Sequence, residues 1–176
     1  QGYAEAQFGL GTMYDQGKGV LQDDGEAHKW FRKAANQGHA DAQYSIGVKY
    51  GYAEGVPQDY VEAVKWFLRA ADQGDAQAQY SLGVSYERGL GVKKDFSQSY
   101  FWYSLAIGSG KLQQVLPQEA AARRESTAKK ISPGQIASLD RRVAEWRPVK
   151  EGAGGIAASE PTAPSQAKKR AKPRSV

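Results

Sequence analysis

The chain repeats a phrase of 22 residues after an interval of 36, and this repetition constrains its fold more than any other feature. Residues 26–47 read EAHKWFRKAANQGHADAQYSIG, residues 62–83 read EAVKWFLRAADQGDAQAQYSLG, and 15 of the 22 positions are identical. With a third, more divergent copy, the repeats span 4–39, 40–75 and 76–110. A fixed period of this length is typical of a small helical unit that stacks on copies of itself.

The second half of each copy predicts an amphipathic helix, because apolar residues recur at i, i+3, i+4, i+7 and i+8. In copy one these residues are Ala27, Trp30, Phe31, Ala34 and Ala35. Asp23 precedes this helix as an N-cap, and Glu26 follows three residues later, as in a capping box. The tryptophan series lies in the middle of the apolar stripe, which places Trp30, Trp66 and Trp102 in the predicted core.

A shorter helix, from about Ala4 to Tyr14, is predicted before it, with Leu10, Gly11 and Tyr14 on its inner face. Glycine inside a helix costs about 1 kcal/mol against alanine. Its recurrence as Gly47 and Gly83 therefore predicts that a neighbouring helix passes too close for a Cβ atom.

The turn between the two helices differs in copy two, where Ala53 stands at the position of Gly17 and Gly89. If this position needs a positive φ, copy two carries either strain or a different turn.

These residues form the pattern AxAQxxLGxxYxxGxGVxxDxxEAxxWFxxAAxQG, which resembles the Sel1-like repeat, a relative of the tetratricopeptide repeat. The resemblance covers residues 1 to about 110. It implies an all-α, right-handed superhelix of helix pairs that serves as a protein-binding scaffold, in most members without catalytic residues. The later stretch that begins SPGQIA resembles the helix that follows such repeats in bacterial members, so we expect a bacterial source. The start QGYAEAQF matches residues 37–44, so we expect a further helix before Gln1 and more repeats in the parent protein.

Residues 111–150 predict two further helices that cap the array. One is expected from near Pro117 to Lys130, and the next begins with Ser132 as N-cap and Pro133 in its first turn. The outward face of this cap is predicted to carry Arg123, Arg124, Arg141 and Arg142. Residues 151–176 are rich in Ala, Gly, Pro and Ser and are predicted to be disordered.

By analogy with tetratricopeptide arrays, the first helices line a concave groove that binds another protein or a peptide. The candidate contact residues are Phe8, Thr12, Asp15, Gln16, Tyr44, Val48, Tyr52, Tyr80, Val84, Glu87 and Arg88. Phe8, Tyr44 and Tyr80 would form an aromatic ladder, and aromatic residues are frequent anchors at interfaces. Packing between adjacent repeats explains these three residues equally well.

The charge is distributed unevenly, which raises a second hypothesis. Residues 1–110 hold 10 Lys and Arg against 13 Asp and Glu, whereas the whole chain has a formal net charge of +5. The C-terminal run KKRAKPR could contact a polyanion or nucleic acid through Lys168, Lys169, Arg170, Lys172 and Arg174. A solvated terminus is the favoured explanation, since the run has no aromatic residue for stacking.

Catalysis, cofactors and metals are disfavoured. The sequence has no glycine-rich phosphate loop and no serine elbow, and we expect no small-molecule substrate. It contains no cysteine and only two histidines, His28 and His39, at different repeat positions. The missing cysteines also argue against the secreted, disulfide-rich relatives linked to hydrolase activity. Signalling and cell-envelope regulation are family-based expectations, and both the periplasm and the cytoplasm stay open as compartments.

Overall fold

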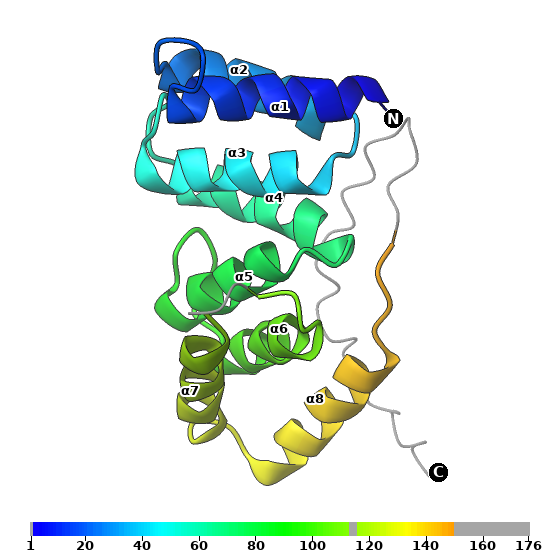
Figure 1. The fold of residues 1–176 in the computed structure, drawn as a ribbon. Coiled ribbons are helices and arrows are strands. Elements are labelled where there is room, and N and C mark those ends of the chain that lie inside the picture. Colours follow the sequence, from blue (N-terminus) through cyan, green and yellow to red (C-terminus); the bar gives the residue numbers. More distant parts are fainter. Residues whose placement is uncertain (1, 113–115, 150–176) are drawn as a thin grey trace, which may run out of the picture.

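The computed structural model describes residues 2–112 and 116–149, and these residues form eight α-helices without a strand (Figure 1). The all-α fold predicted from the sequence is thereby confirmed. No helix in these two ranges is long and apolar enough to cross a membrane. The helices are α1 (Gly2–Gln16), α2 (Asp24–Ala35), α3 (Ala40–Tyr52), α4 (Tyr60–Asp72), α5 (Ala76–Arg88), α6 (Phe96–Gly108), α7 (Leu116–Ala128) and α8 (Pro133–Glu145).

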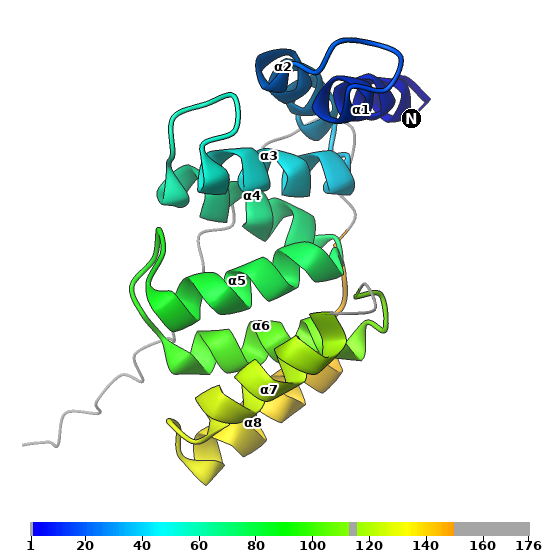
Figure 2. The same cartoon turned by 60° about the vertical axis from the view of Figure 1, so that its left-hand side comes forward.

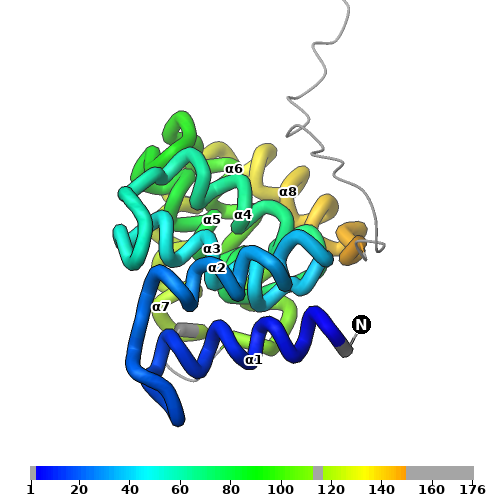
Figure 3. The backbone as a smooth tube through the Cα atoms, turned by 90° about the horizontal axis from the view of Figure 1, so that it is seen from above, coloured from blue at the N-terminus to red at the C-terminus, as the bar shows by residue number. Residues whose placement is uncertain are grey.

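The first six helices form three antiparallel pairs that stack into a solenoid. Pair one is α1 with α2, pair two is α3 with α4, and pair three is α5 with α6. The second helix of each pair also packs against the first helix of the next pair. Figure 3 looks down this stack, with α1 and α2 nearest the viewer.

Aspartate N-caps begin the second helices as predicted. The Asp23 carboxylate accepts a hydrogen bond from the backbone N–H of Glu26 at 2.9 Å, and Asp59 does the same for Glu62. The reciprocal half of the capping box was predicted wrongly. Glu26 instead pairs with Lys29, one helical turn further on, because the ammonium group is a stronger partner than a backbone N–H.

The recurrent helix glycines are explained by the aromatic residue of the partner helix. A Cβ atom on Gly11 would lie 2.5 Å from the Phe31 ring, and one on Gly47 would lie 2.5 Å from the Phe67 ring. The third glycine meets Tyr103 in the same way. The predicted close approach is confirmed, and a ring fills the space that each glycine leaves.

The turn of copy two keeps the geometry of its sister turns and is therefore strained. Ala53 has φ of 61°, close to the 65° of Gly17 and the 77° of Gly89. A left-handed conformation costs about 1–2 kcal/mol for a residue with a Cβ atom.

The buried residues form two clusters. The smaller one joins pair one to pair two, and the larger one joins pairs two and three to α8. The smaller cluster consists of Ala27, Phe31, Ala34, Ala35, Ala42, Ile46 and Trp66.

Two core predictions fail in pair one. Trp66 and Trp102 are buried as predicted, but Trp30 is only half-buried, and the ammonium group of Lys33 lies 3.7 Å from its ring centre. Leu10, predicted on the inner face, is 37% exposed. The reason is positional, because these two sites are covered by the preceding pair in pairs two and three, and the structure describes no pair before α1.

The helices α7 and α8 both pack against α6, at the opposite end of the stack from α1 (Figure 2). Ser132 and Gln135 form the predicted capping box of α8, and Leu139 on α8 is buried in the larger cluster. After α8 the chain turns back toward pair two, where the backbone N–H of Val149 donates to the carbonyl oxygen of Asp72 at 2.8 Å.

Candidate groove on the first helices

Six of the candidate residues form one stripe across α1, α3 and α5. We call this set the first-helix stripe, and all its members are half-buried: Phe8, Thr12, Tyr44, Val48, Tyr80 and Val84. Each aromatic member rests on an aromatic ring of its own pair, with ring centres 5.6 Å apart for Phe8 and Phe31, 5.9 Å for Tyr44 and Phe67, and 5.6 Å for Tyr80 and Tyr103. The aromatic ladder thus has one packed side and one accessible side, and its role in binding stays a prediction.

The polar candidates at the C-terminal ends of the first helices divide into engaged and exposed residues. Asp15 forms an ion pair with Lys49. Glu87 accepts a hydrogen bond from the Tyr103 hydroxyl at 2.7 Å and one from Arg123 at 3.0 Å. Both carboxylates therefore connect helices within the chain. The exposed candidates are Gln16, Tyr52 and Arg88.

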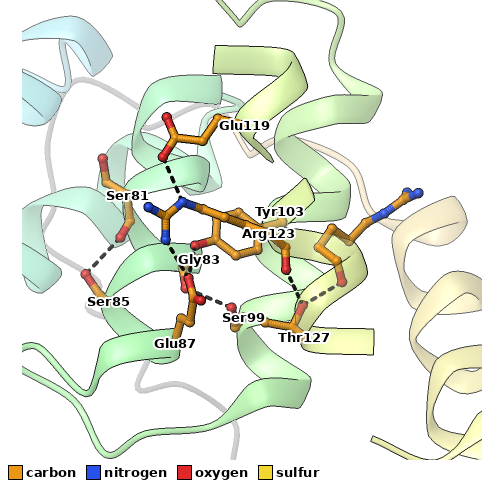
Figure 4. Close-up of polar contacts among 10 residues, drawn as sticks. Ser81, Gly83, Ser85, Glu87, Ser99, Tyr103, Glu119, Arg123 and Thr127 are labelled. Carbon is orange, nitrogen blue, oxygen red and sulfur yellow. Dashed lines mark hydrogen bonds and ion pairs between the residues drawn. The ribbon is translucent and has the colours of Figure 1, made fainter. Parts of the chain in front are cut away.

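Arg123 corrects the prediction that the arginines of the cap face outward. Figure 4 shows its guanidinium group between Glu87 and Glu119, and the Nε atom donates to Glu119 at 2.8 Å. Arg123 points inward because this side of α7 lies against pair three, and the carboxylates of Glu87 on α5 and Glu119 on α7 compensate for its lost hydration. Arg124 is also half-buried, whereas Arg142 is exposed and lies 4.7 Å from the Phe101 ring centre. Arg141 is exposed as predicted.

This network also acts on two of the tyrosines of pair three, Tyr80 and Tyr103. Burial, followed by a hydrogen bond to Glu119, raises the pKa of Tyr80 to about 12. Burial and the hydrogen bond to Glu87 raise the pKa of Tyr103 as well. Both hydroxyls therefore stay protonated near neutral pH, and the Tyr103 hydroxyl acts as a donor.

A cavity of 380 Å³ lies beside the stripe, between the N-terminal ends of α3 and α5. Its charged and polar lining includes Asp41, Asp75, Gln77 and Lys111. The Oε1 atom of Gln77 is buried and has no hydrogen-bond partner among the described residues. Oxygen acceptors thus outnumber the cations in this lining.

Asp75 lines the cavity and makes two contacts there. Its carboxylate caps α5 by accepting a hydrogen bond from the backbone N–H of Ala78 at 2.6 Å, and it lies near the carboxyl group of Asp41. Burial raises the pKa of Asp75 to about 6; the bond from Ala78 opposes this rise, and the charge of Asp41 adds to it. Asp75 is therefore largely ionised at pH 7, at an energetic cost.

Pair one carries a different arrangement at the equivalent place. His39 stands where pair two has Asp75, and its Nε2 atom lies 2.8 Å from the Glu5 carboxylate. The His39 ring also stacks on Phe8, with ring centres 4.7 Å apart, and its Nδ1 atom accepts a hydrogen bond from the N–H of Ala42. In pair one, the His39 imidazole thus pairs with the Glu5 carboxylate and covers the Phe8 ring.

Lys49 connects the first two pairs away from the cavity. Its ammonium group forms ion pairs with Asp15, Asp24 and Glu54, and its side chain is only 4% exposed. Burial opposes its charge, but the three carboxylates outweigh burial, so the pKa of Lys49 is raised. This ion cluster joins α1 and α2 to α3.

Sequence reasoning missed the cavity and the Lys49 cluster. A signal for the cavity existed, because one repeat position changes from His39 to Asp75 to Lys111. The signal for the ion cluster was a lysine at the repeat position of Met13. In the described part of the chain, no group of three or more His, Cys, Asp or Glu residues could hold a metal ion. The predicted tail and its basic run lie outside the described residues.

The repeat unit is shared with known proteins. A family model described as "Sel1 repeat" matches residues 4–39, 40–75 and 76–111. The crystal structure of a Sel1 repeat protein from Oxalobacter formigenes is similar, with a TM-score of 0.67 and 31% sequence identity over 81% of this chain and 56% of that one. The structure of c5321, described as a protective antigen of uropathogenic Escherichia coli strains with an SLR fold, gives a TM-score of 0.61 and 26% identity over 83% of this chain. The chain spans 56% of the first protein and 38% of the second. No curated protein shows significant similarity to it.

Proposed function

The chain belongs to the Sel1 repeat family, whose solenoids commonly serve as protein-interaction scaffolds, and we propose that it binds a protein or peptide partner without catalysing a reaction. The proposed binding surface is the concave groove that the first helices line. The observation that supports this proposal is the first-helix stripe, because six half-buried side chains, five of them apolar or aromatic and the sixth Thr12, recur at two positions in the first helices of three consecutive pairs. Aromatic residues that are partly packed and partly accessible are typical anchors of protein interfaces.

The glycines beside the stripe offer a test that leaves the core intact. A Cβ atom on Gly9 of α1 or Gly51 of α3 would meet no atom within 4 Å. An arginine at both positions would therefore add bulk and charge beside Phe8 and Val48 of the stripe while raising helix propensity. The matched control places arginine at Gly108 and Gly134, which are equally open and lie at the end of α6 and the start of α8.

The experiment is a crosslinking pull-down from a bacterial lysate with the wild-type chain, the variant G9R/G51R and the control variant G108R/G134R. Circular dichroism first establishes that all three have the same helix content. We expect a partner that is recovered with the wild-type chain and the control but lost with G9R/G51R. Recovery of the same partner with all three proteins would contradict a groove on the first helices.

A further inference from the structure

One edge of the first-helix stripe is acidic. Glu5 and Asp41 are exposed at the N-terminal ends of α1 and α3, and Asp75 stands at the start of α5. Lys111 is the cation of the cavity lining at this edge. A partner that lies across the stripe must therefore pass beside carboxylates, and its own charge decides whether they attract or repel it.

Pair one shows what these carboxylates accept. There the His39 ring bonds to Glu5 and stacks on the aromatic member of the stripe, Phe8. In pair two the same position is Asp75, so the equivalent acid, Asp41, faces a second carboxyl group instead of a nitrogen base. In pair one the His39 ring occupies the space beside the acid and the aromatic residue, whereas the corresponding region of pair two contains the cavity.

The surroundings of this cavity favour one kind of side chain. Three hydrogen-bond acceptors line the cavity: the carboxylates of Asp41 and Asp75 and the unpartnered Oε1 atom of Gln77. Tyr44 of the stripe is also near, since the pKa of its hydroxyl group is raised first by burial and second by the charge of Asp75. A guanidinium or ammonium group supplies several donors and a positive charge, and it can also lie against a tyrosine ring. A carboxylate or phosphate would instead face two like charges.

We propose that the groove binds a peptide segment in which apolar side chains lie on the first-helix stripe and one arginine or lysine reaches into the cavity between Asp41 and Asp75. This inference rests on the proposed function and names the chemistry of its partner. The partner's cation would take, in pair two, the place that His39 takes in pair one.

The test uses a phage-displayed library of random 12-residue peptides, selected in parallel on four immobilised proteins. These are the wild-type chain, D41N/D75N, the groove variant G9R/G51R, and D59N/D95N. The last variant removes two charges from N-caps of the second helices and serves as the matched control. Asparagine caps helices about as well as aspartate, so both acid variants are expected to fold.

We expect the wild-type chain and D59N/D95N to enrich peptides that combine bulky apolar residues with Arg or Lys. Synthetic copies of these peptides should bind D41N/D75N about tenfold more weakly, as measured by fluorescence anisotropy. The inference would be overturned if the enriched peptides had no excess of Arg or Lys, or if they bound D41N/D75N as tightly as the wild-type chain. The proposed groove would still be supported in that case, provided that G9R/G51R abolishes binding. Failure to enrich any peptide, or binding unchanged in G9R/G51R, would overturn the proposed function together with it.

Discussion

Replacing Asp75 with asparagine should make the protein more stable at pH 7. The pKa of Asp75 is raised from about 3.8 to about 6, since folding buries its carboxylate beside Asp41. The folded chain therefore holds this proton more tightly than the unfolded chain does. Stability is gained as the pH falls through 6 toward 4, and it is lost as the pH rises again.

The size of the effect follows from this shift. Two pH units correspond to about 3 kcal/mol, which is the ceiling for the penalty of an ionised Asp75. Water at the mouth of the cavity screens the two carboxylates, so we expect the variant to recover about half of this, ~1.5 kcal/mol. Asparagine retains the N-cap of α5, so no helix-capping energy is lost. For a chain of this size the melting temperature should rise by about 3–6 °C.

The assay is chemical denaturation of the wild-type chain and D75N between pH 4 and pH 8. The stability difference should be largest at pH 7–8 and should disappear near pH 4. Burial lowers the pKa of His28, which weakens the fold in acid, but both proteins share this effect and it cancels in the difference. D59N is the control, because Asp59 is an exposed N-cap. A difference that does not change with pH, or a D75N variant no more stable than D59N at pH 7, would refute the reasoning.

Four further substitutions probe the turns and the contacts between helices. A53G should stabilise the chain by about 1 kcal/mol in urea denaturation, since glycine relieves the left-handed turn, whereas G89A should destabilise it. S109Q should raise the melting temperature, with a gain in stability of about 1 kcal/mol. The Oε1 atoms of Gln7 and Gln43 accept hydrogen bonds from Gln37 and Gln73, whereas the buried Oε1 atom of Gln79 has no partner within the described ranges, because Ser109 stands at the repeat position of Gln37 and Gln73. No gain in melting temperature would mean that the Gln79 oxygen is already hydrogen-bonded. K49M should cost about 2 kcal/mol, since it leaves three partly exposed carboxylates together, and an unchanged denaturation midpoint would show that the ion cluster is dispensable.

The repeat pattern predicted the fold because it encodes contacts that recur in every pair. The spacing that identified Gly11 and its two equivalents also identified a real steric requirement, met by the ring of Phe31. The same pattern failed for Leu10 and Trp30, because burial at these positions comes from a neighbouring pair and not from the residue's own helix.

Departures from the repeat carried information about the C-terminal helices that the pattern itself lacked. Phe101 stands where the other copies have Lys29 and Lys65, and it is buried beneath Arg142 of α8. An apolar residue on an otherwise charged helix face thus indicated a covering element. The pairing of Asp41 with Asp75 could not be predicted, since it depends on how closely two helix ends approach in space.

The division of the buried residues into two clusters has a consequence for the motions of the molecule. Four of the seven residues that hold pair one onto pair two are alanines, so little apolar surface is buried there for each residue. The Lys49 ion cluster supplements this contact, and salt weakens its attraction to a limited extent, because the ammonium group is buried while the three carboxylates are partly exposed. The amides of α1 and α2 should therefore exchange with solvent through a partial opening that salt promotes, while pairs two and three exchange only when the whole array unfolds. A rise in ionic strength would thus increase how often the first pair separates from the rest of the solenoid.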